Sequence, residues 1–222
     1  MNRRKNKLSK VKRAGQPDWD TMYREGTPPW ETGCAAGELV RVLNESKLPR
    51  GTLLEIGCGT GADAVCLART GFEVTAVDSS PTALDRARTR AELAGASIRF
   101  VLDDVFKFAR TCGAFDVVYD AGFYHFIRRI DLDKFLDLLW RVTRPGSYYF
   151  TLAGAAGEEA EDGPPQVSDE EIRLELGRLF ECVHLRPFRF ESPRRLEGYL
   201  GWSCLMRRPI PPCGMFRSNL EQ

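Results

Sequence analysis

The stretch Leu53-Leu54-Glu55-Ile56-Gly57-Cys58-Gly59-Thr60-Gly61 joins a short apolar run to three alternating glycines. The apolar run has the length of a buried strand, and a helical pattern follows it over residues 62–70. Glycine lets the backbone turn sharply and lets a ligand approach closely, beside the free N–H groups of the next helix. An ordinary strand–helix turn does not need three glycines. The stretch therefore predicts a ligand-binding loop between a parallel strand and a helix.

Short apolar runs alternate with helical patterns along the following part of the chain. This alternation is typical of a doubly wound, parallel sheet with helices on both faces. Two late apolar runs, residues 180–185 and 199–206, indicate an antiparallel hairpin at the carboxyl-terminal edge. We therefore expect an α/β fold with a mostly parallel seven-stranded sheet. The other expected strands are residues 52–56, 73–77, 98–102, 115–119 and 148–152, and the main helices are residues 62–70, 81–94, 131–142 and 168–178.

The composition predicts one globular domain between two terminal segments. The 222 residues are 43% hydrophobic, and 32 basic against 31 acidic side chains leave a net charge of +1. Basic residues crowd the first thirteen positions, so residues 1–16 are expected to be a disordered leader. Residues 17–207 then form the domain, in which the Gly- and Pro-rich residues 153–167 are a surface flap. Residues 208–222, rich in proline at their start, are expected to be a flexible tail.

Cysteine and histidine usage bears on compartment and metal content. The seven cysteines form no C-x-x-C pair and their number is odd, which favours reduced thiols in a cytoplasmic protein. The two histidines, His125 and His184, lie far apart in the sequence, so no metal site is expected. No segment approaches the ~18 consecutive apolar residues of a membrane span. The balanced charge gives no sign of a nucleic-acid or membrane partner.

The glycine spacing bears on the kind of cofactor. In a dinucleotide fingerprint the third glycine stands three residues after the second, where this chain has Ala62. Asp78, at the end of the second expected strand, suits the ribose of a dinucleotide or of another ribose-bearing cofactor. The glycine pattern therefore has to decide between the two.

Five segments, in order, resemble the motifs of class I S-adenosylmethionine-dependent methyltransferases. They are Glu55-x-Gly57-Cys58-Gly59-Thr60-Gly61, Val77-Asp78-Ser79-Ser80-Pro81-x-Ala83-Leu84, Asp103-Asp104, Phe115-Asp116-Val117-Val118 and Arg144-Pro145-Gly146. The resemblance spans residues 19–207 and implies a Rossmann-like methyltransferase fold. It also implies S-adenosyl-L-methionine as cofactor and S-adenosyl-L-homocysteine as product.

The resemblance assigns roles to single positions. The three glycines would face the methionine part of the cofactor, and Asp78 would bind both ribose hydroxyls. Asp104 and Val105 would lie beside the adenine. These positions all follow the carboxyl ends of expected strands, where open parallel sheets bind ligands. The full expected cofactor set is Trp19, Tyr23, Trp30, Glu55, Gly57, Cys58, Gly59, Gly61, Asp78, Ser79, Asp104, Val105 and Asp120.

The segment after the fourth expected strand holds the candidates for catalysis. A sulfonium methyl is already activated, so the site mainly has to orient a nucleophile, and a general base is needed only for a protonated acceptor. Asp120 matches the position that faces the reacting centre. His125 is the best base because an imidazole titrates near neutrality, although a purely structural role stays equally open. The segment lacks the Asn/Asp-Pro-Pro-aromatic motif of nucleic-acid base methyltransferases, which argues against that acceptor.

An aromatic segment precedes the first strand. Trp19-Asp20-x-x-Tyr23-x-x-Gly26-x-x-Pro29-Trp30-Glu31-x-Gly33 resembles the same region of thiopurine, thiol or halide, and tellurite-resistance methyltransferases, which act on small nucleophiles. It looks too broken for a helix. We expect residues 19–33 to form a lid whose aromatic faces attract the sulfonium, with Tyr23 also in the catalytic set.

Three functions are compatible with these patterns. The first is methyl transfer to a small molecule through a thiol, a chalcogen oxyanion or another heteroatom, by a monomer or weak homodimer. An alternative is a protein or RNA methyltransferase that docks its substrate through the basic leader. A third, a nicotinamide dehydrogenase or a non-catalytic cofactor-binding protein, fits the glycine spacing less well.

Overall fold

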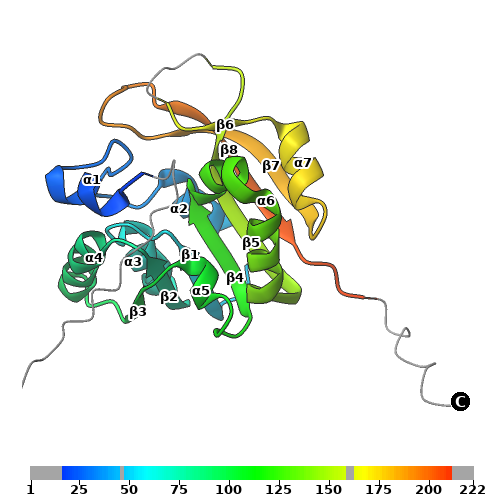
Figure 1. Cartoon of the computed structure of the whole chain (residues 1–222), viewed down its shortest axis with the longest axis horizontal. Coiled ribbons are helices and arrows are strands. Elements are labelled where there is room, and N and C mark those ends of the chain that lie inside the picture. The colour runs from blue at the N-terminus through cyan, green and yellow to red at the C-terminus, as the bar shows by residue number, and fades with distance from the viewer. Residues whose placement is uncertain (1–16, 46–47, 159–162, 212–222) are drawn as a thin grey trace, which may run out of the picture.

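A mixed sheet of eight strands forms the centre of the computed structural model, which describes residues 17–45, 48–158 and 163–211. The strand order is β3-β2-β1-β4-β5-β8-β7, and β6 pairs with β5 outside this path (Figure 1). The strands are β1 (Thr52–Ile56), β2 (Glu73–Asp78), β3 (Ile98–Leu102), β4 (Phe115–Ala121), β5 (Thr143–Ala155), β6 (Gln166–Val167), β7 (Glu181–Phe190) and β8 (Tyr199–Arg207). The pairs from β3 to β5 are parallel, and β8 pairs antiparallel with both β5 and β7.

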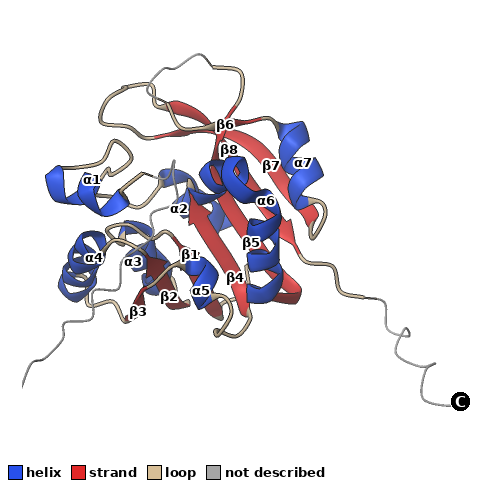
Figure 2. Cartoon of the chain, in the orientation of Figure 1, coloured by secondary structure: helices blue, strands red, loops and turns tan. Residues whose placement is uncertain are grey.

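Seven helices of the described chain connect and cover the strands (Figure 2). They are α1 (Trp19–Glu25), α2 (Gly37–Glu45), α3 (Ala62–Arg69), α4 (Pro81–Leu93), α5 (Val105–Phe108), α6 (Phe123–Val142) and α7 (Asp169–Leu176). One apolar cluster joins α5, α6 and α7 to one face of the sheet, and a second joins α2, α3 and α4 to the other. Successive strand residues point to opposite faces, so Leu53 packs in the second cluster and Leu54 in the first. The predicted α/β fold is confirmed, including the antiparallel strands at its edge.

The sheet reverses its direction of winding at β1. The chain proceeds from β1 to β2 and β3 on one side, and β4 then pairs with β1 on the other side. In open parallel sheets, ligands bind beyond the carboxyl ends of the strands at such a switch point. The glycine loop follows β1 at this place, and Asp78 ends the neighbouring β2.

Several predicted boundaries were wrong. The flap contributes β6, which makes eight strands where seven were expected. Strand β5 extends from Thr143 to Ala155, and Arg144-Pro145-Gly146, expected to separate helix from strand, lies inside it with a register shift against β4. The hairpin strands are longer than expected because β7 continues to Phe190.

The helix expected over residues 131–142 begins earlier, at Phe123. The Asp120 carboxylate accepts hydrogen bonds from the N–H groups of Phe123 (2.9 Å) and Tyr124 (3.0 Å), which satisfies the free donors at a helix start. The backbone of Asp131 is not helical (φ −162°, ψ 81°), so α6 consists of two helical pieces that meet there. The lid was also expected to lack a helix, yet residues 19–25 form α1, begun by Asp18.

The predicted terminal segments lie partly outside the described residues, and Arg208 of the tail packs on the domain. The predicted leader, residues 1–16, and residues 212–222 of the predicted tail lie outside the described residues. Arg208, assigned to the tail from the sequence, is buried and donates to the carbonyl oxygens of Trp140 (2.9 Å) and Thr143. Within the described ranges, no helix is both long and apolar enough to cross a membrane.

Candidate active site

The glycine loop adopts a backbone that side chains would strain. Gly57, Gly59 and Gly61 have φ values of +69°, +52° and +77°, a region that costs other residues ~1–2 kcal/mol. The N–H of Gly59 donates to an oxygen of the Asp78 carboxylate (2.8 Å), and the N–H of Ser80 donates to the other oxygen (2.8 Å). Burial raises the pKa of Asp78, although these N–H groups oppose the effect. The loop and the end of β2 therefore form one unit.

Each loop glycine approaches a different neighbour. A Cβ on Gly57 would lie 3.4 Å from the ring of Phe123, and a Cβ on Gly59 would lie 2.8 Å from the hydroxyl of Tyr23. A Cβ on Gly61 would lie 2.8 Å from the Cβ of Ala87, on α4. Gly57 thus lets α6 pack against the loop, and Gly59 lets the lid do so. Gly61 lets α4 pack closely against the same loop.

Glu55 lies beneath the loop with an unsatisfied oxygen. Its side chain is buried, and Oε2 has no hydrogen-bond partner among the described residues. Burial, together with the nearby carboxylates of Asp63 and Asp78, raises the pKa of Glu55 well above its usual range. Buried polar groups in folded proteins are nearly always paired, so a lone buried carboxylate oxygen beside a ligand-binding loop indicates a donor from outside the chain.

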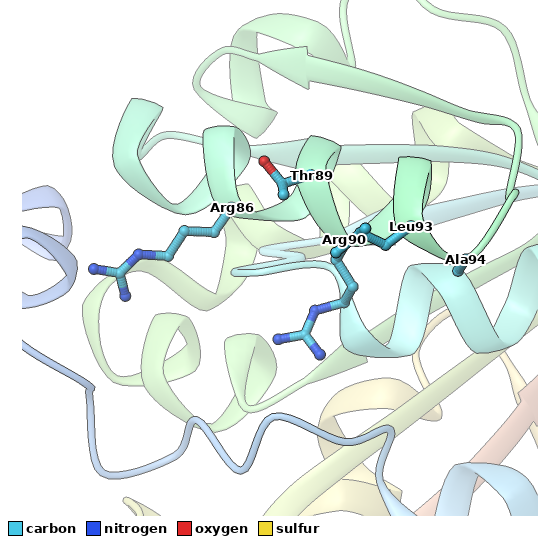
Figure 3. Close-up of a pocket in the computed structure, with 5 residues that line it drawn as sticks. All are labelled: Arg86, Thr89, Arg90, Leu93 and Ala94. Carbon is cyan, nitrogen blue, oxygen red and sulfur yellow. The ribbon is translucent and has the colours of Figure 1, made fainter.

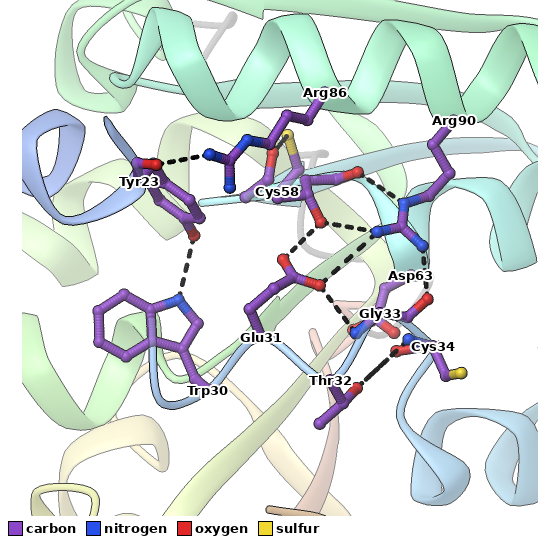
Figure 4. A network of polar contacts seen from close by, with 12 residues as sticks. Tyr23, Trp30, Glu31, Thr32, Gly33, Cys34, Cys58, Asp63, Arg86 and Arg90 are labelled. Carbon is purple, nitrogen blue, oxygen red and sulfur yellow. Dashed lines mark hydrogen bonds and ion pairs between the residues drawn. The ribbon is translucent and has the colours of Figure 1, made fainter. Parts of the chain in front are cut away.

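Aromatic side chains of the lid pack over the loop and reach α6. The Trp30 indole Nε1 donates to the Tyr23 hydroxyl (3.0 Å), as Figure 4 shows. Tyr23 is 5% exposed. Trp19 packs edge-on against Trp30, with ring centroids 5.6 Å apart, and against Phe126 of α6 at 5.0 Å. Burial raises the pKa of Tyr23. The lid thus bridges the glycine loop and the first piece of α6.

Polar contacts fasten the lid to α4 and to the loop. Asp20 accepts hydrogen bonds from the Ser80 hydroxyl (2.8 Å) and the Thr82 N–H (3.1 Å) at the start of α4. Arg86 donates to the carbonyl of Tyr23 (2.7 Å), and Arg90 donates to the carbonyls of Thr60 (3.0 Å) and Gly33. Glu31 accepts from the Thr60 hydroxyl and pairs with Arg90, as Figure 4 shows.

A hollow of about 530 Å³ lies beside these arginines on α4 (Figure 3). It is lined by Arg86, Thr89, Arg90, Leu93 and Ala94. No residue of the glycine loop lines it, and Asp78 does not reach it. The hollow is therefore separate from the place where the predicted cofactor residues gather.

The adenine-side residues lie at the end of β3. Asp104 is exposed and accepts from the N–H of Phe106 (2.8 Å), so it begins α5, and Val105 is buried. The N–H of Asp103 donates to the carbonyl of Asp78 (3.2 Å), which connects this turn to the glycine-loop unit. Ser79 is exposed beside it, and Cys58 is buried within the loop, where burial raises the pKa of its thiol.

Both carboxylate oxygens of Asp120 accept hydrogen bonds from the protein. It is fully buried and accepts from the N–H groups of Phe123 and Tyr124, the Tyr149 hydroxyl (2.6 Å) and the Thr151 hydroxyl (3.2 Å). Burial raises its pKa to about 6, and these four donors counteract part of that rise. The carboxylate anchors α6 to β5, and the orientation of Asp120 towards the reacting centre stays a prediction.

His125 also differs from the base expected at this position. The Gly154 N–H donates to Nδ1 (2.9 Å), so the proton of the neutral ring resides on Nε2. Burial lowers the pKa of His125 to about 3, so the imidazole is neutral and a poor proton acceptor. Its Nε2 edge lies over Gly122, 3.4 Å from where a Cβ of that glycine would be, at the end of β4. The side chain is a hydrogen-bond donor in this arrangement.

Comparisons with known proteins bear on the family to which the chain belongs. Residues 53–146 match the protein family described as "Methyltransferase domain". The 2-heptyl-1-hydroxyquinolin-4(1H)-one methyltransferase of Mycobacteroides abscessus is 28% identical over 73% of this chain and 72% of its own length. Thiocyanate methyltransferase 1 of Arabidopsis thaliana is 29% identical over 83% of each chain. The chain is a class I S-adenosylmethionine-dependent methyltransferase.

Solved structures agree with the fold of this methyltransferase. A structure titled "Conversion of a Disulfide Bond into a Thioacetal Group during Echinomycin Biosynthesis" superposes with a TM-score of 0.74 at 24% identity, covering 86% of this chain and 90% of that one. TehB from Haemophilus influenzae gives 0.65 at 16% identity, covering 85% and 66%. S-adenosylmethionine is the methyl donor of this family, and solved methyltransferases of the same fold contain it or S-adenosylhomocysteine. Among the residues described, no cluster of His, Cys, Asp or Glu is arranged to hold a metal ion.

Sequence reasoning missed the residues that fasten the lid of the methyltransferase. Arg86 and Arg90 are four residues apart on a helix, so they share a face, and that spacing was an available signal. Asp20 and Glu31 stand beside the aromatic residues that were singled out. The partly buried Asp63, which accepts from the Ala36 N–H (2.8 Å) and the Tyr119 hydroxyl (2.8 Å), gave no signal in the sequence.

Proposed function

We propose that this methyltransferase acts on a small molecule whose nucleophilic atom is already ionised near neutral pH, such as a thiolate or a chalcogen oxyanion. One observation carries the proposal: each of the described candidates for a general base already accepts a hydrogen bond from the protein at its basic atoms. Both oxygens of Asp120 are engaged, and Nδ1 of His125 accepts a backbone N–H. Tyr23 accepts from Trp30, and burial raises its pKa. An acceptor that ionises by itself needs no base.

The names of the relatives agree with this class. Thiocyanate methyltransferase 1 and the probable thiol methyltransferase 2 of Arabidopsis thaliana are named for sulfur acceptors. The Mycobacteroides relative is named for an N-hydroxylated quinolone. Thiols and N-hydroxyl groups both have a lower pKa than an alcohol. This common property supports an acceptor that arrives as an anion.

The residues around the glycine loop fit the methyl donor. When bound, S-adenosylmethionine supplies a methyl group on a positively charged sulfur, with a neutral thioether as leaving group. The unpartnered oxygen of Glu55 suits the ammonium group of the methionine part, and the Asp78 carboxylate suits the ribose hydroxyls. The aromatic faces of Tyr23, Trp30 and Trp19 favour a nearby cation by ~0.5–2 kcal/mol. Asp104 and Val105 complete the set at the adenine side.

The acceptor side would then orient and stabilise an anion. The Nε2 edge of His125 lies over Gly122, directly after β4, and Phe123 and Phe126 would supply apolar walls. The lid would keep water away from the reacting atoms. This favours the reaction, because a hydrated anion is a weaker nucleophile. Holding the nucleophile in line with the methyl group contributes up to ~7–11 kcal/mol to the lowering of the barrier.

The pH dependence of turnover tests the proposal. We would measure kcat/KM between pH 5 and 10 with an aromatic thiol of low pKa and an alkyl thiol of higher pKa. The rise in kcat/KM should follow the pKa of each thiol, and His125→Gln should lower the rate without removing the rise. His184→Gln, which changes the other histidine, on β7, is the matched control. One inflection at the same pH for both thiols, absent from His125→Gln alone, would establish an enzyme base and contradict the proposal.

A further inference from the structure

The first piece of α6 is a separate structural unit. It begins after Gly122, whose φ is +90°, and ends at the non-helical backbone of Asp131. Asp131 accepts from the N–H of Lys134 (3.0 Å) and so begins the second piece as a cap. We call residues 123–130 the site helix. Its orientation is not fixed by the rest of α6, because a helix break absorbs changes of direction.

The site helix carries the acceptor side of the proposed site. His125 extends from it towards β5, Phe126 packs against Trp19 of the lid, and Phe123 packs beside Gly57. A displacement of this helix would therefore move the hydrogen-bond donor and the apolar walls together. The glycine loop and Asp78 stand on β1 and β2 and would stay in place.

Four side chains form the polar contact between the site helix and α7. The Tyr124 hydroxyl donates to Glu175 (2.7 Å), and the Arg128 guanidinium donates to both oxygens of the same carboxylate (2.8 and 3.0 Å from Nε). Arg128 also pairs with Glu171 (2.6 Å). Tyr124 is fully buried, and the side chains of Arg128 and Glu175 are each 12% exposed.

This burial separates the contact from ordinary surface ion pairs. Exposed pairs fix little, because both side chains stay mobile in water. Here one carboxylate receives a bidentate guanidinium and a phenol while largely withdrawn from solvent, and bidentate pairs impose a defined geometry. Helix α7 itself is fixed by a capping box at Ser168 and by the buried Ile172 and Leu176.

We infer that Tyr124, Arg128 and Glu175 are positioning residues that set the acceptor geometry of this methyltransferase through the site helix. Glu175 on α7 acts as the reference point, and Tyr124 and Arg128 hold two successive turns of the site helix to it. The inference rests on the proposed function in placing the acceptor beside this helix. The hydrogen bonds of these three residues join two helices on the acceptor side, whereas the glycine loop and Asp78 stand on β1 and β2.

The test compares Glu175→Gln with a matched control. Asp133→Asn removes the acidic partner of Arg178, which follows α7 (2.8 Å). Asp133 lies in the second piece of α6, beyond the break at Asp131. Glu175→Gln should lower kcat/KM for a thiol acceptor by about 10-fold or more, since small misplacements of reacting groups cost up to ~100-fold. It should also change the preference between a small and an aromatic thiol. Affinity for S-adenosylmethionine in calorimetry should stay within about twofold, and Asp133→Asn should match wild type throughout.

A second readout does not depend on turnover. The chain has two histidines, so the ring nitrogens of His125 can be assigned by ¹⁵N correlation spectra with His184→Gln as reference. Glu175→Gln should shift the His125 ring signals, and Asp133→Asn should not. If wild type methylates no thiol or oxyanion while these signals still shift, the proposed acceptor is wrong and the positioning role stands.

Two results would overturn the inference. One is wild-type kcat/KM and unshifted His125 signals in Glu175→Gln. The other is a loss of acceptor and cofactor affinity by the same factor, which would indicate general loosening of the fold. If Glu175→Gln does not fold, Tyr124→Phe provides the same comparison, because it removes one hydroxyl and keeps the buried ring.

Discussion

Replacing Gly61 by alanine tests whether the third loop glycine serves packing. Two costs are expected. The backbone at φ +77° is unfavourable for alanine by ~1–2 kcal/mol. The new Cβ would lie 2.8 Å from the Cβ of Ala87 and 3.2 Å from its Cα, and forcing an extra carbon into such a contact costs ~1–3 kcal/mol.

Gly95 provides the matched control for that change. Its φ is +62°, and a Cβ there would meet no atom within 4 Å. Gly95→Ala therefore carries only the backbone cost of ~1–2 kcal/mol. The loss of flexibility in the unfolded chain is similar for the two variants and cancels in the comparison. Gly61→Ala should be less stable than Gly95→Ala by the packing cost alone, ~1–3 kcal/mol.

Urea denaturation followed by circular dichroism and by tryptophan fluorescence measures this difference, provided that both signals give one transition. Ala87→Gly should partly rescue Gly61→Ala because it removes the methyl group that the new side chain meets. The double variant should be more stable than the sum of the single changes predicts, by ~0.5–3 kcal/mol. Equal stability of Gly61→Ala and Gly95→Ala, with additive behaviour in the double variant, would refute the close approach of α4.

Four further changes have defined expectations. Asp78→Ala should weaken S-adenosylmethionine binding in calorimetry by at least about 10-fold, since a charged hydrogen bond contributes ~1.5–3 kcal/mol; unchanged affinity would show that the cofactor lies elsewhere. His125 has a pKa of about 3 when folded and an ordinary value of 6.5, so the unfolded state binds the extra proton between these limits. As pH falls from 6.5 towards 3, wild type should lose stability relative to His125→Gln by ~1.4 kcal/mol per pH unit, measured by urea denaturation at each pH, and a constant difference would contradict the burial argument. Truncation after residue 207 should lower the melting temperature by removing Arg208 with its carbonyl contacts, whereas truncation after residue 211 should not; equal effects would count against a structural role for Arg208. Deleting residues 1–13 should leave methylation of a small thiol unchanged, and a large loss would favour the alternative in which the leader docks a macromolecule.

Local patterns made it predictable that the candidate cofactor residues gather in one place. The glycines, Asp78 and the acidic turn after β3 each follow a strand directly, so the strand order places them together. The regular alternation of strands and helices likewise indicated the sheet. Capping residues marked the start of α4 and α7.

The acceptor half depended on contacts that are distant in the sequence. Asp120 and His125 are suitable bases by residue type, but their partners Tyr149, Thr151 and Gly154 all come from β5. Those contacts make Asp120 an anchor for α6 and make His125 a neutral hydrogen-bond donor. The start of α6 was missed for a related reason, because the Asp120 carboxylate caps it from the preceding strand.

The antiparallel direction of β8 has a practical consequence for handling the enzyme. Because Arg207 pairs with Tyr148 in the first half of β5, β8 ends near the amino-terminal ends of the parallel strands, on the side opposite the glycine loop (Figure 1). A fluorescent reporter or surface linker joined after residue 211 would lie at that far side, so an immobilised layer would present the glycine loop and the lid to the solution. The same handle joined before residue 17 would adjoin α1 and the lid contacts. For biosensor construction, the carboxyl terminus is the preferable attachment point.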